Sequence, residues 1–213
     1  MAFEIDVPWL EIDDLRRRAE DFLRQKHPGG ELPVPVELIV ERMGIDIVPV
    51  PDFRRLMDLE ACTSADLSTI RVDKYVYEQI DRRYRYTLAH ELGHMVLHPQ
   101  IFAELREDIH AQDAWIELIR GIPANIQSRL EWQAYTFAGL FLVPTKPLLA
   151  RYEAVIPGVR ADVRRAKAKG IRRTAWAEPA WCNLCELVAE PFNVSSQVIQ
   201  KRLDSEGRSS KDL

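Results

Sequence analysis

The sequence lacks three features that would place it outside the ordinary globular proteins. Its cysteines, Cys62, Cys182 and Cys185, cannot all pair within one chain, which argues against a disulfide scaffold. Its longest apolar run, residues 138–143, is far shorter than the roughly 18 residues of a membrane-spanning helix. The first residues are acidic where a secretory signal peptide needs positive charge. We therefore expect a cytoplasmic protein with reduced thiols and no membrane contact.

The sequence also lacks a strong charge of either sign. It has 29 Lys and Arg against 33 Asp and Glu, a formal net charge of −4, so direct nucleic-acid binding is not expected of the chain as a whole. One local exception is the run at residues 160–173, with seven basic residues and one acidic residue. This run could contact an acidic partner or nucleic acid, but a solvated helix and loop is the simpler interpretation.

Composition and length predict a globular chain with one main domain and an extension. Hydrophobic residues make up 46% of the 213 residues and charged residues 29%, and no internal repeat stands out. We expect a domain over residues 1–156 and a helical C-terminal extension over residues 157–213, with the boundary near Pro157-Gly158.

Hydrophobic periodicity predicts helices first, then short strands, then more helices. Helical spacing is found at residues 9–26, 35–43, 81–97, 103–120, 127–143, 181–189 and 194–203. Strand-like patterns cover residues 45–50 and 67–72, with one or two more possible at 59–63. The last residues, 205–213, are polar and expected to fray. This order predicts an α+β fold and not the regular alternation that builds a parallel sheet.

The most informative segment is His90-Glu91-Leu92-Gly93-His94. Residues four apart lie on one face of a helix, so His90 and His94 can reach the same divalent ion. Glu91 lies beside that face, where it can contact a metal-bound water without being a ligand. This is the HExxH arrangement of zinc peptidases, in which the glutamate accepts the proton of the attacking water.

A zinc site of this kind needs a third protein ligand. The continuation with a third histidine six residues after His94 is absent, because position 100 is Gln. A glutamate on a later helix is the other common option, and Glu131 is well placed for it. His98, one turn after His94, is a further possibility, but Pro99 suggests that the helix ends there, which favours a supporting position for His98.

These segments together resemble the ImmA/IrrE family of zinc metallopeptidases. The resemblance rests on residues 85–94, on the Glu-x-x-Ala-x-x-Phe-Ala segment that begins at Glu131, on strand-like residues 45–50 and 70–73, and on a weaker match at 192–203. It implies a zincin-like α+β fold, in which a small, twisted, mostly antiparallel sheet packs on the active-site helix and additional helices complete the domain. It also implies that His90, His94 and Glu131 bind Zn²⁺, although other divalent metals are possible, and that Glu91 is the general base.

The resemblance further implies a cytoplasmic zinc endopeptidase that cleaves a regulatory protein, either a DNA-binding repressor or an antitoxin-like protein. The alternative is a non-proteolytic regulatory or toxin–antitoxin binding module that keeps the metal site for structure.

The sequence departs from the family pattern at two places. Tyr135 stands where the family usually has Asn; it could donate a hydrogen bond to a developing oxyanion or simply fill the core. The 36 residues between His94 and Glu131 also form a long interval, and the predicted helix around Trp115 could cover the cleft and restrict substrates, or only enlarge the core. Cys182 and Cys185 have helical spacing and no second pair, which favours a structural role over a metal or redox site.

Overall fold

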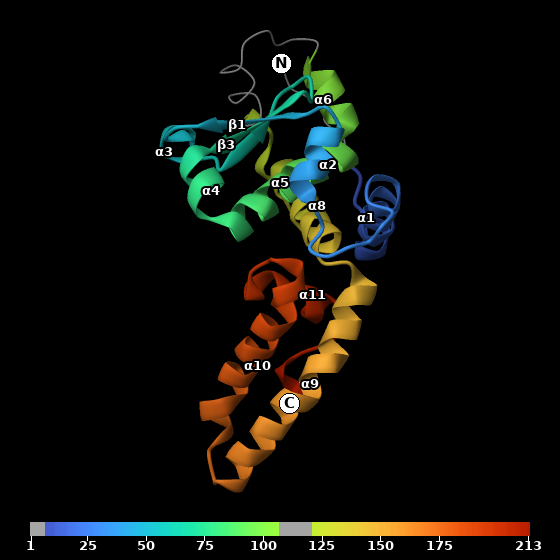
Figure 1. Cartoon of the computed structure of the whole chain (residues 1–213). Coiled ribbons are helices and arrows are strands. Elements are labelled where there is room, and N and C mark those ends of the chain that lie inside the picture. The colour runs from blue at the N-terminus through green and yellow to red at the C-terminus, as the bar shows by residue number, and fades with distance from the viewer. Residues whose placement is uncertain (1–6, 107–120) are drawn as a thin grey trace. The chain divides into compact units, whose positions relative to one another are not determined.

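The computed structural model describes residues 7–106 and 121–213 (Figure 1). The helices are α1 Ile12–Lys26, α2 Val36–Arg42, α3 Phe53–Met57, α4 Lys74–Gln79, α5 Asp81–Leu97, α6 Pro99–Arg106, α8 Ala124–Leu142, α9 Thr145–Ala168, α10 Arg173–Ala189 and α11 Ser196–Ser205. The strands are β1 Asp46–Val50, β2 Ala61–Thr63 and β3 Thr69–Asp73, and two short 3₁₀ turns, η1 Glu190–Phe192 and η2 Ser210–Asp212, flank α11. The predicted helix at 103–120 falls mostly outside the described residues.

Contacts divide the chain into two compact units, residues 1–141 and residues 142–213. The expected boundary near Pro157-Gly158 instead lies inside α9, which continues through Pro157. The helix is maintained there because Tyr152, Ile156 and Val159, at helical spacing, are all buried. No helix in the described part of the chain is long and apolar enough to span a membrane.

The first unit is built around a three-stranded sheet in the order β1-β3-β2. β1 pairs with β3 in parallel and β2 pairs with β3 in antiparallel orientation, so the sheet is mixed and not mostly antiparallel as expected. The α+β class is confirmed. The central strand β3 buries Ile70 and Val72 completely, while Pro49 lies in β1 at the sheet edge, where a missing N–H is tolerated.

Helix α5 is the central element of the first unit, and its bounds match the predicted helix at residues 81–97. It is buried on almost all sides and contacts α2, α4 and β2. The preceding helix α4 begins at a well-formed cap, because the Asp73 carboxylate accepts hydrogen bonds from the N–H groups of Tyr75 and Val76. The end of β3 is thereby joined directly to α4, which leads into α5.

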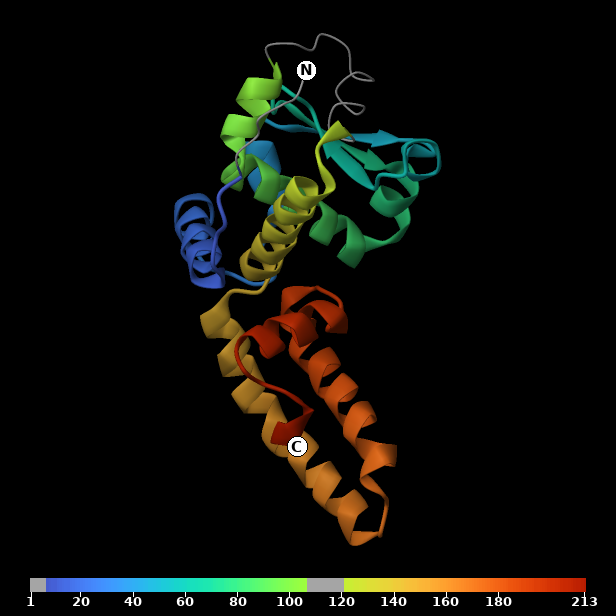
Figure 2. The same ribbon diagram turned by 180° about the vertical axis from the view of Figure 1, so that it is seen from behind.

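The second unit is helical. Its helices α9 and α10 run side by side as a hairpin, and α11 packs on α10 (Figure 2). The expected fraying of residues 205–213 is wrong for this tail: Ser209 caps η2, and the buried Tyr152 hydroxyl donates a hydrogen bond to Asp212. That contact supplies a buried hydroxyl with the partner it needs.

Candidate metal centre

Two consecutive turns of α5 and one turn of α8 bring three metal-binding side chains together. His90 Nε2 and His94 Nε2 lie 3.0 Å apart, and the Glu131 carboxylate lies 3.2 Å from the first and 3.5 Å from the second. One coordinating atom from each residue falls within 4.8 Å of the others. Two imidazoles and one carboxylate are a donor set that suits zinc and leaves a coordination position open. The residues present therefore fit a zinc ion.

The approach of α8 to α5 depends on small residues at their contact. A Cβ atom placed on Gly93 would lie 3.0 Å from the backbone oxygen of Ala134 and 3.1 Å from its Cα. A larger residue at either position would separate the helices, and with them the histidines from Glu131. The two helices therefore make close contact where Ala134 of α8 faces Gly93, a glycine within the His-Glu-x-x-His segment of α5.

The histidines also influence the charge of Glu131. Burial alone raises the pKa of this carboxyl group, but hydrogen bonds to His90 and His94 outweigh burial and hold the pKa below its ordinary value. Glu131 is therefore ionised at neutral pH, which is the state that a carboxylate ligand requires.

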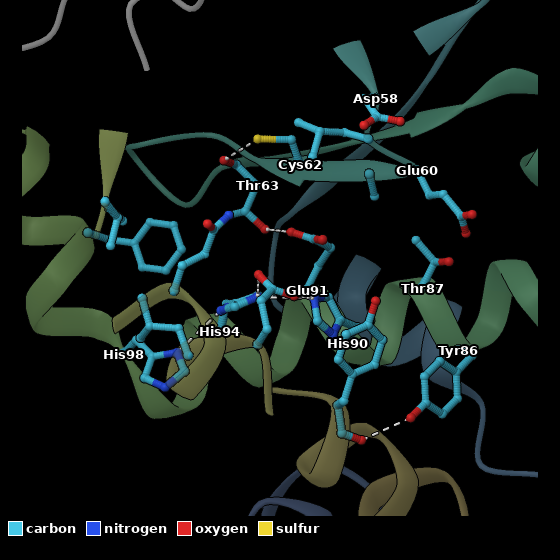
Figure 3. Close-up of a pocket in the computed structure, with 18 of the residues that line it drawn as sticks. Asp58, Glu60, Cys62, Thr63, Tyr86, Thr87, His90, Glu91, His94 and His98 are labelled. Atoms are coloured by element: carbon cyan, nitrogen blue, oxygen red, sulfur yellow. Dashed lines mark hydrogen bonds and ion pairs between the residues drawn. The ribbon is translucent and has the colours of Figure 1, made fainter. Parts of the chain in front are cut away.

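Glu91 lines the same pocket and is held by the sheet. The Thr63 hydroxyl, at the end of β2, donates a 2.7 Å hydrogen bond to Glu91 Oε2 (Figure 3). Both residues are buried. Sequence reasoning missed Thr63; the only available signal was its place at the end of the expected strand at 59–63. The bond fixes one carboxylate oxygen and leaves the other for chemistry in the pocket.

His98 lies next to the three residues but is not one of them. Its Nδ1 is 3.3 Å from His94 Nδ1, on the side of the His94 ring that faces away from Glu131, and its Nε2 is 2.8 Å from Gln133 Oε1. Burial, together with the neighbouring His94, lowers the pKa of His98 to about 4. His98 is therefore a neutral ring behind His94.

Tyr135 lies over the ring of His90, with the ring centroids 4.2 Å apart, and its side chain is 53% exposed. The hydroxyl of the stacked Tyr86 donates a 2.9 Å hydrogen bond to the backbone oxygen of Tyr135. Burial and the charges of Glu131 and Glu91 raise the pKa of Tyr135. Its phenol is thus a protonated donor at neutral pH on the wall of the pocket.

The pocket around these residues has a volume of about 500 Å³ and is lined by both charged and apolar side chains. In the charged part of the lining, Arg83 donates to both carboxylate oxygens of Glu60. The apolar part of the described lining includes Ile101, Phe102, Ile122 and Leu130, which belong to one buried hydrophobic cluster. The predicted helix around Trp115, which could cover the cleft, lies outside the described residues.

The cysteine pair and the basic run that the sequence analysis singled out lie in the second unit, whereas the ligand set lies in the first. Cys182 and Cys185 are free thiols on α10; burial raises the pKa of both, that of Cys185 to about 12, which disfavours the thiolate. In the basic run, Arg160 donates to the backbone oxygen of Asp212, and Lys167 lies over the ring of Trp176.

A helical His-Glu-x-x-His segment facing a glutamate from a second helix defines a site of the zinc-peptidase type. The comparison with protein families agrees: the model of the IrrE N-terminal-like domain, a peptidase family (Peptidase_M78), matches residues 77–204. The chain belongs to this metallopeptidase family. The match includes every member of the proposed ligand set and extends into the second unit.

Among solved structures, a transcriptional regulator from Mycobacterium tuberculosis is similar, with 19% sequence identity and a TM-score of 0.48. The alignment covers 90% of this chain and 46% of that chain, so this chain spans less than half the length of its neighbour. No curated protein gives a significant match.

Proposed function

We propose that the protein is a zinc-dependent endopeptidase. The observation that carries this proposal is the convergence of His90, His94 and Glu131 in one pocket with a separately held carboxylate, Glu91. In this assignment the first three residues hold the metal and Glu91 is the general base. Membership of the metallopeptidase family supports the same assignment.

The roles of the protein groups follow from their positions. A bound zinc ion would act as a Lewis acid that polarises the scissile carbonyl and makes water at the site more acidic. Glu91 would accept the proton of the attacking water and pass it to the leaving amine. Thr63 would hold the carboxylate in position for both transfers, and the Tyr135 hydroxyl would donate a hydrogen bond to the developing oxyanion.

We further propose that the substrate is a regulatory protein of the cytoplasm, a DNA-binding repressor or an antitoxin-like protein. The support is the resemblance to the ImmA/IrrE family and the free state of all three cysteines. The pocket has a volume of about 500 Å³, and the apolar side chains in its lining would suit a substrate that carries a hydrophobic side chain near the cleaved bond.

The test is zinc content together with cleavage of candidate DNA-binding repressors and antitoxin-like proteins, beginning with any that a neighbouring gene encodes. Glu91→Gln should keep the zinc and lose cleavage, because the amide cannot act as a base. The matched control is Glu78→Gln, which makes the same change at an exposed residue of α4 and should cleave normally.

Absence of bound zinc, or equal cleavage by Glu91→Gln, would refute the endopeptidase proposal. A stable complex with an uncut partner, unchanged in Glu91→Gln, would instead favour the regulatory binding module.

A further inference from the structure

Hydrogen bonds continue from the candidate metal centre to the N-terminal segment of the described chain. His94 Nδ1 is 3.3 Å from His98 Nδ1 (Figure 3). His98 Nε2 is 2.8 Å from Gln133 Oε1. The Gln133 amide then donates a 2.8 Å bond to the backbone oxygen of Pro8. We call the two linking side chains the His98–Gln133 network. Three separate parts of the first unit, α5, α8 and the segment before α1, meet in it.

The chemistry of these atoms allows only one arrangement of protons when His94 binds a metal. His94 Nε2 faces His90 and Glu131, so this atom must keep its lone pair, and the proton is on Nδ1. His98 Nδ1 then accepts that proton's hydrogen bond, and His98 Nε2 donates to Gln133 Oε1. The side-chain NH₂ of Gln133 is left to donate to Pro8. Each nitrogen or oxygen atom of the network is therefore either a donor or an acceptor, and its partner has the opposite role.

The network is closed to solvent. Gln133 is 0% exposed and His98 is 4% exposed, so water cannot readily replace a lost partner. His90 provides a contrast, because its buried Nδ1 has no hydrogen-bond partner among the described residues. Of the two histidines, His94 is therefore the one whose ring orientation the surrounding protein fixes by hydrogen bonding.

The N-terminal segment is attached to the same helix that carries Glu131. Besides the bond from Gln133 to Pro8, Arg129 donates to the backbone oxygen of Val7. Trp9 stacks on Trp132 with the ring centroids 5.0 Å apart and the planes at 8°. All three contacts come from residues of α8 within two positions of Glu131.

We propose that His98 and Gln133 are positioning residues that hold His94 in its Nδ1-protonated form and join the metal centre to the N-terminal segment. The inference rests on the proposed function only in assuming that His94 binds the metal. Partners of this kind fix the orientation of a metal-binding histidine, and their loss typically weakens metal binding by about 10- to 100-fold.

The test is the dissociation constant for Zn²⁺, measured by competition with a chelator at neutral pH. His98→Phe and Gln133→Met keep the packing volume but remove the hydrogen bonds, and each should weaken zinc binding about 10- to 100-fold. The double variant should bind zinc about as tightly as whichever single variant has the lower zinc affinity, because both changes break the same network. Gln79→Met, the same change at an exposed residue of α4, should bind zinc as the wild type does.

Unchanged zinc affinity in both folded single variants, or losses that multiply in the double variant, would overturn the proposal.

A second measurement covers the case in which a variant fails to fold. In the zinc-loaded wild type, long-range ¹H–¹⁵N spectra should show His94 protonated at Nδ1 and His98 protonated at Nε2; the opposite form of His98 would overturn the proposal. A wild type that binds no zinc refutes both this proposal and the proposed function. A wild-type protein that binds zinc but cleaves no substrate refutes only the proposed endopeptidase function.

Discussion

Single residues determine how the pocket can stabilise charge during a reaction. Tyr135 stands where the ImmA/IrrE family usually has Asn, and its ring packs on His90. An amide and a phenol are both hydrogen-bond donors, so the substitution keeps the donor while changing its reach. The exposed position and the protonated phenol favour contact with a bound substrate over a purely structural role.

We expect Tyr135→Phe to lower kcat by about 100-fold, the usual loss when one oxyanion donor is removed, with little change in KM. The measurement is steady-state cleavage of a peptide substrate, combined with zinc content, which should not change. Tyr75→Phe, at an exposed tyrosine of α4, is the matched control. If Tyr135→Phe cleaves as fast as the wild type, the phenol only packs against His90.

Sequence analysis could find the residues whose relation is local. His90, Glu91 and His94 lie within five positions, and helix geometry alone places them together. Glu131 was a candidate because it is a glutamate on a later predicted helix, and the family resemblance supported it, since no local rule brings α8 to α5. Thr63 could not be found, because its contact with Glu91 joins residues 28 positions apart and depends on how β2 meets α5. Gln133, the hydrogen-bond partner of His98, could not be found for the same reason, because the two residues are 35 positions apart.

At the scale of elements, the site depends on how closely α5 and α8 pack. Gly93→Ala should destabilise the protein by about 1–3 kcal/mol, because its Cβ meets the backbone of Ala134 and cannot be accommodated by a side-chain rotation. Zinc affinity should fall as well, since α8 carries Glu131. The measurements are urea unfolding and zinc titration.

Gly158→Ala is the matched control for this prediction. Gly158 lies within α9, and a Cβ there meets nothing within 4 Å. The same substitution should therefore stabilise α9 by up to about 1 kcal/mol and leave zinc affinity unchanged. Equal effects of the two substitutions would show that the contact between α5 and α8 is not tight.

The structure differs from the predicted boundary where the burial of one helix face outweighs the helix-breaking tendency of proline. Pro157-Gly158 marked an expected boundary, since proline removes a helical hydrogen bond. In the structure the helix continues, because residues on both sides of Pro157 are buried against the rest of the second unit. Neither the length of α9 nor the division at residues 141 and 142 could be obtained from spacing alone.

For the whole molecule, buried tyrosines predict a loss of stability at high pH. Burial is the first cause that raises the pKa of Tyr86 and of Tyr152 to about 12, above the ordinary value of 10. A phenol with a raised pKa in the folded state stabilises that state fully below pH 10. This stabilisation is lost as the pH rises through 12.

The free energy of unfolding should accordingly decrease from pH 10 upwards. Urea unfolding between pH 8 and pH 11.5 measures it. Tyr152→Phe should make the decrease less steep, and the exposed Tyr75→Phe should not. A constant free energy over this range would contradict the raised pKa values.

The stacking of Trp9 on Trp132 gives the protein a built-in optical reporter. Two indoles 5.0 Å apart and nearly parallel are close enough to couple electronically and to contribute a far-ultraviolet circular dichroism band. That band disappears when the N-terminal segment detaches from α8. Detachment of the segment, including detachment caused by the loss of the Gln133–Pro8 bond, can therefore be followed in an unlabelled sample by circular dichroism.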